Sequence, residues 1–246
     1  MTDSSAGEKR QGRFPETHWS VVLAAADDSP QGADALAQLC RSYWYPIFAY
    51  LRATGHPSDG AEDLTQAFFV HVIENRTIGR ADQLKGTFRG FLIGALKHFV
   101  ANERDRNRAQ KRGGRVKFVP FDLDDAERQY LADHRAVGAD PVELVFDRRW
   151  AQVIARQAML RLQSQFEDDL PTFERLRPFL VGGVDSGSYE RAAQDLAISL
   201  PLVKTAIHRM RRRYREALRS EVAVTVSAPH EIDGELRYLI TVLGTE

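Results

Sequence analysis

The chain has 246 residues, of which 43% are hydrophobic, a composition typical of folded proteins and long enough for one large domain or two small ones. Lys plus Arg and Asp plus Glu are equally numerous, at 34 each, so the formal net charge is zero. The chain has a single cysteine, Cys40, which excludes an internal disulfide. Residues 1–15 lack the apolar segment of a signal peptide, and no apolar run is long enough to span a bilayer. We therefore expect a cytoplasmic protein that does not enter a membrane.

Helical periodicity runs through almost the whole sequence, whereas alternating strand patterns are scarce. We therefore predict an all-α fold, made of two small helical domains joined by a linker. Segments rich in turn-forming residues divide the chain into a disordered N-terminus, a first helical domain, the linker, a second helical domain and a C-terminal tail. The boundaries of these five segments, in chain order, are 1–16, 17–112, 113–140, 141–226 and 227–246.

The first domain contains four predicted helices, at 20–26, 32–53, 58–74 and 87–110. The core stripe of the third helix consists of Leu64, Phe68, Val72 and Ile73. Asp63, Gln66 and Phe69 lie beside that stripe, and Phe69 adds apolar surface outside it. A helix that is apolar on more than one side usually has more than one partner.

The zero net charge conceals two basic blocks. Residues 97–117 contain eight Lys or Arg against two acidic residues, and residues 204–219 contain seven against one. The first block follows a predicted buried face formed by Phe91, Leu92, Ala95, Leu96, Phe99 and Val100. Two separate basic blocks suggest two contacts with one polyanion, although either block alone could be a solvated helix face.

The linker, 113–140, has no sustained periodicity and carries an acidic cluster formed by Asp122, Asp124, Asp125 and Glu127. In the second domain, the helical pattern is interrupted at 170–171 and at 181–188. The tail is predicted to add one short helix at 231–242. This helix could be a regulatory element or could pack on the second domain, and packing is the favoured interpretation.

Residues 189–210 carry the sharpest local pattern, a short helix followed by a tight turn and a second helix. Ser199 is a suitable N-cap for the second helix, because its hydroxyl can accept a hydrogen bond from a free backbone N–H. Pro201 falls in the first turn of that helix, where its missing donor costs nothing. Ala197 occupies a position that usually holds Gly in such turns, because the backbone there has a positive φ.

The second of these helices has one apolar stripe and a basic remainder. Its stripe consists of Val203, Ile207, Met210, Tyr214 and Leu218. The opposite face presents Thr205, His208, Arg209 and Arg212, and it is flanked by Lys204, Arg211 and Arg215. This pattern is typical of a helix-turn-helix, whose second helix enters the major groove of DNA. A membrane-surface or partner-binding basic helix is the alternative, but it would lack the preceding short helix and turn.

Three segments resemble a known family when they are taken in order: AEDLTQAFF (61–69), FRGFLIGALKHFVANERDRNRAQKR (88–112) and SYERAAQDLAISLPLVKTAIHRMRRRYREAL (188–218). They are similar to the two-domain extracytoplasmic-function sigma factors of bacterial RNA polymerase, over roughly residues 17 to 222. The resemblance implies that the chain binds core polymerase, recognises the minus-ten and minus-thirty-five promoter elements and helps to melt the DNA.

The resemblance also implies three sets of site residues. The residues that match the polymerase-docking motif for the β′ clamp are Asp63, Gln66 and Phe69. The residues that match the minus-ten strand-reading segment are Lys97, His98, Asn102, Arg104, Arg106, Arg108, Lys111 and Arg112. The residues of the helix for the minus-thirty-five duplex are Lys204, Thr205, His208, Arg209, Arg211 and Arg212.

The partners implied are core RNA polymerase, through its β′ clamp and β flap, and promoter DNA, with an anti-sigma factor as a further candidate. Family members commonly have Asn where this chain has His98 and Asp where it has Asn102. The resemblance therefore leaves open which minus-ten bases are read.

A stand-alone helix-turn-helix transcriptional regulator is the alternative function, and it would bind duplex DNA without polymerase. An enzyme is not expected. The seven histidines are scattered without metal-ligand spacing, and no glycine-rich phosphate loop follows a strand. We accordingly predict no catalytic residue, metal or cofactor.

Overall fold

The computed structural model describes residues 30–74, 87–109, 126–132, 141–181, 185, 187–226 and 228–244. At residues 30–41, 73–74, 104–109, 143 and 181 it describes the backbone alone. Every regular element in these ranges is a helix, which confirms the all-α prediction. The predicted helix at 20–26 lies outside the described residues.

Within the described residues, three helices form the N-terminal part of the fold. They are α2 (Pro30–Ala53), α3 (Ser58–Glu74) and α4 (Phe88–Ala109), and their bounds differ from the predicted ones by two residues at most. Gly55, with a φ of 91°, ends α2. The backbone N–H groups of Gly55 and His56 return to the carbonyls of Arg52 and Leu51, so the last turn of α2 is closed by a Schellman motif.

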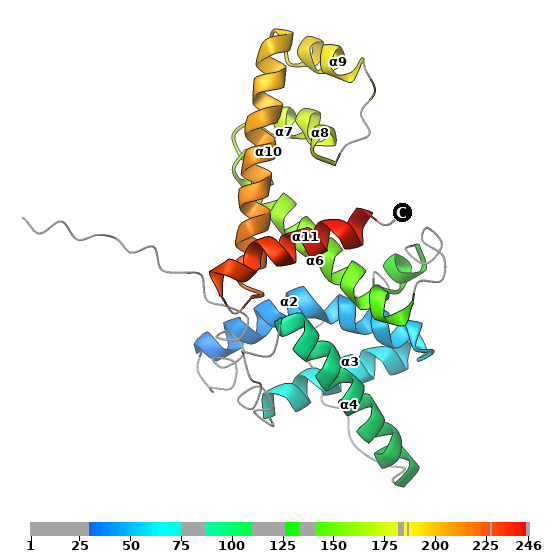
Figure 1. The fold of residues 1–246 in the computed structure, drawn as a ribbon. Coiled ribbons are helices and arrows are strands. Elements are labelled where there is room, and N and C mark those ends of the chain that lie inside the picture. Colours follow the sequence, from blue (N-terminus) through cyan, green and yellow to red (C-terminus); the bar gives the residue numbers. More distant parts are fainter. Residues whose placement is uncertain are drawn as a thin grey trace, which may run out of the picture.

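The C-terminal part is built around two long helices, α6 (Val142–Ser164) and α10 (Leu200–Ala223), which pack against each other. Between them in sequence are α7 (Leu170–Leu176), α8 (Pro178–Val181) and α9 (Ser188–Asp195). In Figure 1, α10 extends from α11 to α9, and α7 and α8 lie along it. The predicted interruption at 170–171 is present but lies a few residues earlier, because α6 ends at Ser164 and α7 already begins at Leu170. Asp169 caps its N-terminus, and Pro171 occupies the first turn, where proline is tolerated.

Two apolar cores hold these helices together. The first is shared by α2, α3, α4, the first half of α6 and the end of α10, and its largest fully buried side chains include Tyr43, Phe48, Phe68, Leu92 and Trp150. The second joins the end of α6 to α7, α8, α9 and the first half of α10, through Leu162, Phe173, Leu176, Phe179, Ala192, Val203, Ile207 and Met210. Each fully buried large side chain contributes about 1.5–3 kcal/mol. The proposed division into domains at 113–140 stays a prediction.

The C-terminal tail forms a short 3-10 helix, η3 (Pro229–Glu231), and then α11 (Ile232–Gly244). Helix α11 packs against both α6 and α10, and Ile232, Leu239 and Val242 are buried in the first core. The predicted tail helix at 231–242 is confirmed, and so is its packing against the C-terminal helices.

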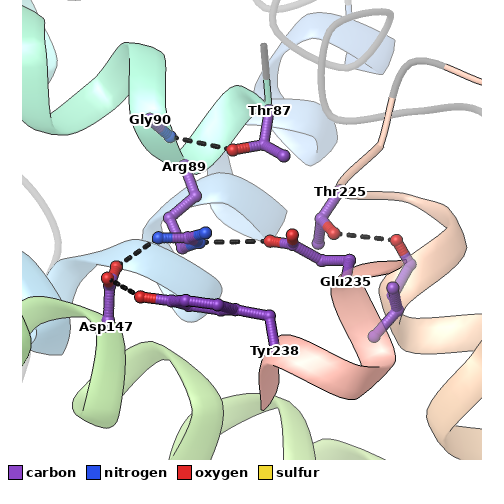
Figure 2. Close-up of polar contacts among 8 residues, drawn as sticks. Thr87, Arg89, Gly90, Asp147, Thr225, Glu235 and Tyr238 are labelled. Carbon is purple, nitrogen blue, oxygen red and sulfur yellow. Dashed lines mark hydrogen bonds and ion pairs between the residues drawn. The ribbon is translucent and has the colours of Figure 1, made fainter. Parts of the chain in front are cut away.

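A polar cluster at the first core joins α4, α6 and α11 (Figure 2). The guanidinium of Arg89 donates hydrogen bonds to Glu235, at 3.1 Å, and to Asp147. Tyr238 also donates to Asp147, and the Arg89 guanidinium lies 4.4 Å from the centre of the Tyr238 ring. Burial and the bond to Asp147 raise the pKa of Tyr238 to about 12, so its hydroxyl keeps the proton that it donates.

Residues 126–132, inside the segment predicted as an aperiodic linker, are helical. Ala126 and Tyr130 are buried there in the first core. Glu127 accepts two hydrogen bonds from Arg52, at 2.6 and 3.0 Å, and one from Ser58, at 3.0 Å. The prediction is therefore wrong for these residues, which pack against α2 and the start of α3. The rest of 113–140 lies outside the described residues.

Among the described helices, none combines the length and the apolar character that crossing a bilayer requires.

Candidate nucleic-acid interface

The corner between α9 and α10 is tight, and one residue in it has an unusual backbone conformation. Ala197 has a φ of 50°, as the sequence predicts. The N–H of Ala197 bonds to the carbonyl of Gln194, and the N–H of Ile198 bonds to the carbonyl of Ala193, each at 3.1 Å. This is again a Schellman ending, like that of α2, but with Ala in the left-handed position in place of Gly.

Helix α10 starts as predicted, with one difference. Ser199 is its N-cap, with extended backbone angles, and Pro201 lies in the first turn. The hydroxyl of Ser199 makes no capping hydrogen bond, however, so the expected bond to a backbone N–H is wrong.

The predicted apolar stripe of α10 is confirmed. Val203, Ile207 and Met210 are buried, and Tyr214 and Leu218 are half-buried. The six residues proposed for the minus-thirty-five duplex are all exposed: Lys204, Thr205, His208, Arg209, Arg211 and Arg212. The structure thus brings them together on the outer surface of one helix, but on two different sides of it.

Three of the six face the preceding helix. Lys204, His208 and Arg211 line an open groove of about 560 Å³ between α9 and α10, together with Tyr189, Glu190 and Ile207. Arg211 donates two hydrogen bonds to the carbonyl of Phe179, at 2.8 and 3.0 Å, and so caps the short helix α8. Its guanidinium therefore has a structural role, because it links α10 to α8.

The other three, Thr205, Arg209 and Arg212, follow one another at spacings of four and three residues and lie on one face of α10. The hydroxyl of Thr205 donates to the carbonyl of Pro201, at 3.0 Å, one turn earlier. Arg212 lies 3.7 Å from Glu216, in an exposed pair that is worth little to stability. This face can approach a ligand without disturbing the core.

Two nearby arginines that we did not assign to DNA have partners within the chain. Arg219 pairs with Asp233 at the start of α11. The guanidinium of Arg213 lies 5.6 Å from the centre of the Phe166 ring. Both contacts tie α10 to neighbouring elements.

In the N-terminal part, the buried face of α4 is largely as predicted. Leu92, Leu96, Phe99 and Val100 are buried, and Phe91 and Ala95 are half-buried. Lys97, His98 and Asn102 are exposed. The helix backbone continues through positions 104, 106 and 108, but the side chains of Arg104, Arg106 and Arg108 lie outside the described residues, as do Lys111 and Arg112 entirely.

A mostly apolar groove of about 470 Å³ lies beside these exposed residues, between α3 and α4. It is lined by His71, Gly90, Phe91, Gly94, Ala95, His98, Phe99 and Asn102. Two of the eight lining residues, His98 and Asn102, belong to the proposed minus-ten set.

The proposed polymerase-docking residues on α3 differ in accessibility. Asp63 is exposed, and Gln66, half-buried, donates to Glu62 at 2.9 Å. Phe69 is only 6% exposed and its ring packs at 6.1 Å from that of Phe68. The expectation that Phe69 adds outer apolar surface is wrong, because its ring belongs to the first core. A partner can reach little of it.

The sequence alone does not predict the bonds that Arg89, Arg52 and Arg211 make within the chain. Each partner is more than 30 residues away in sequence, at Glu235, Glu127 and Phe179. Local periodicity carries no signal for such contacts. Leu202, an exposed leucine in the first turn of α10, is likewise not among the residues predicted from the sequence.

Comparison with protein-family models, with curated proteins and with solved structures found no match for this chain.

Proposed function

We propose that the chain is a sigma factor of the extracytoplasmic-function type, which binds core RNA polymerase and directs it to promoters. In this proposal α9, the corner at Ala197 and α10 form a helix-turn-helix, with α10 as the recognition helix for the minus-thirty-five duplex. The end of α4 and the residues after it would contact the minus-ten strand.

The observation that carries the proposal is the exposed face of α10. Thr205, Arg209 and Arg212 project from a helix whose opposite side is buried, so the cationic surface is held in place by the second core. A rigid helix with exposed N-terminal residues suits the major groove, where base edges can be reached. The arginines further along the helix are suited to phosphates, which position the protein without reading sequence.

A second observation supports a separate nucleic-acid contact in the N-terminal part. Lys97, His98 and Asn102 are exposed on α4, beside the apolar groove, at the beginning of the first basic block. Unpaired bases stack on apolar and aromatic surfaces, with about 1–3 kcal/mol per base. Such stacking would offset part of the melting cost of roughly 1.4 kcal/mol per base-pair step.

The docking proposal now rests on Asp63 and Gln66, since Phe69 is buried. Asp63 is exposed on α3, where a partner can contact it.

The decisive experiment is co-purification of the full chain with bacterial core RNA polymerase, followed by run-off transcription from promoter fragments. The proposal requires both a stable complex and promoter-directed transcripts. If the protein binds duplex DNA but forms no complex with the polymerase, the alternative function applies, a stand-alone helix-turn-helix regulator.

A further inference from the structure

Leu202 is a large apolar side chain in an exposed position. It lies in the first turn of α10 and is 57% exposed, although its neighbour Val203 is fully buried. An isolated exposed leucine is common on protein surfaces and by itself means little. Leu202 differs from such a residue because it lies on the same face of α10 as the exposed arginines, where a ligand can contact it.

Leu202 begins the row that Thr205, Arg209 and Arg212 continue, at spacings of three, four and three residues. At about 100° per residue these four residues share one face of α10, away from the buried stripe. Their order along the helix is apolar, hydroxyl, cationic, cationic. A ligand bound along this face would therefore contact Leu202 at the N-terminal end of the helix and the two arginines further towards its C-terminal end.

The corner before α10 holds a second exposed apolar residue. Ile198, the residue after Ala197, is among the exposed large hydrophobic residues of the described chain. The hydroxyl proton of Thr205 is engaged by the Pro201 carbonyl, so this side chain offers an acceptor to a ligand. The leading end of the face thus combines the apolar side chain of Leu202 with a hydrogen-bond acceptor on Thr205, and neither side chain is charged.

The major groove of DNA contains one apolar group on its base edges, the C5 methyl of thymine. We propose that Leu202 contacts the C5 methyl of a thymine in duplex DNA and so determines part of the sequence that the chain reads. This inference rests on the proposed function, because it requires that α10 enters the major groove. Leu202 is not among the six residues that the sequence suggests for the minus-thirty-five duplex, and its proposed contact is with a single thymine.

The test uses the full chain assembled with core RNA polymerase. Bound duplexes are selected from a pool with a randomised window, and the most enriched duplex is then prepared with each thymine in turn replaced by deoxyuridine, which lacks only the methyl group. Affinities are compared for the wild type, Leu202→Ala and Leu160→Ala. Leu160 is a matched control, because it is 59% exposed but lies on α6.

We expect the wild type to lose about fourfold in affinity at one thymine when its methyl is removed, which is the effect of about one buried methyl group. Leu202→Ala should bind the thymine and deoxyuridine duplexes equally at that position, and Leu160→Ala should behave as the wild type does. The inference is overturned if Leu202→Ala keeps the wild-type ratio, or if the wild type discriminates at no position.

A second variant separates this outcome from failure of the proposed function. Arg209→Ala should weaken binding to both duplexes while the thymine-to-deoxyuridine ratio is kept. If the chain forms no complex with polymerase, the proposed function fails, and the same comparison of duplexes with the chain alone decides the role of Leu202. If no duplex sequence is enriched in either case, this inference fails as well. If a sequence is enriched and binding depends on Arg209, only the role of Leu202 is in question.

Discussion

Arg89 of α4 forms an ion pair with Glu235 of α11, 3.1 Å away in space and 146 residues away in sequence. Both side chains are largely buried. Burial alone would lower the pKa of Arg89, but Asp147 and Glu235 outweigh it and raise this pKa, so the guanidinium stays charged. The tail helix is thereby attached to the N-terminal helices by charge as well as by apolar contact.

We predict that Glu235→Gln lowers the free energy of unfolding by about 2 kcal/mol, because it leaves a buried guanidinium with one carboxylate partner. Urea denaturation would measure this change. Asp233→Asn is the matched control, since Asp233 lies in the same helix but pairs with Arg219 at the surface, and its loss should cost no more than about 0.5 kcal/mol. Equal effects of the two changes would contradict a structural role for the buried pair.

Ala197 offers a change that should stabilise the protein. Its φ of 50° costs a residue with a Cβ roughly 1–2 kcal/mol, which Gly avoids. Gly also loses more entropy on folding, so we expect Ala197→Gly to raise the free energy of unfolding by about 0.5 kcal/mol. Thermal unfolding would detect this. Ala101→Gly, at an exposed position inside α4, should act in the opposite direction, by about 1 kcal/mol.

The contact between Arg52 and Glu127 should make the free energy of unfolding depend on pH in the acidic range. Burial alone would raise the pKa of Glu127, but the hydrogen bonds from Arg52 and Ser58 outweigh it and lower this pKa below 4.5. A lowered carboxyl pKa gives stability that is present above the unfolded value and lost as the pH falls through the folded value. The stability advantage of the wild type over Glu127→Gln should therefore shrink below about pH 4.5. Denaturation curves at several pH values would show it, and a difference that stays constant would contradict the role of this carboxylate.

Under the proposed function, Arg209→Glu should abolish binding of duplex DNA while leaving the complex with core polymerase intact. For Arg209→Ala, which weakens binding without reversing the charge, the slope of the logarithm of the binding constant against the logarithm of the salt concentration should fall in magnitude by about 0.9 for the one phosphate contact removed. Fluorescence anisotropy with a labelled promoter duplex, over a range of salt, measures both effects. Arg237→Glu makes the same change in charge at an exposed position on α11 and should leave binding unchanged. Promoter-directed transcription that survives Arg209→Glu would refute α10 as the reading helix.

The adjacent arginines Arg211 and Arg212 should differ in their effect on stability. Arg211→Ala removes the two hydrogen bonds to the Phe179 carbonyl, and we expect a loss of about 1 kcal/mol. Arg212→Ala removes only an exposed pair with Glu216, so stability should change by less than about 0.5 kcal/mol. Chemical denaturation of the two variants tests this. A large loss for Arg212→Ala would show that its role in the fold has been underestimated.

The sequence predicts the helices well because their signals are local. The stripe of Val203, Ile207 and Met210 follows from the helical period, and the positive φ of Ala197 follows from the geometry of a tight turn. The exposed residues of α10 can be predicted in the same way, because residues outside the apolar stripe face away from the core.

The contacts between distant segments could not be predicted in this way. Phe69 illustrates the difficulty, because its position beside the stripe of α3 suggests exposure, whereas packing in the first core buries it. Glu127 likewise belongs to a segment without periodicity, and its pairing with Arg52, together with the burial of Ala126 and Tyr130 in the first core, holds that segment against α2. Helical period specifies faces, but it does not specify which faces meet.

Helix α6 contributes Trp150 to one core and Leu162 to the other. It therefore acts as a spacer of defined length between the N-terminal helices and the corner at Ala197. Adding one residue in its middle would rotate one core by about 100° against the other, whereas a flexible connection would absorb any insertion. The position of the corner at Ala197 relative to α4 is consequently set by α6 together with α10, whose end also lies in the first core.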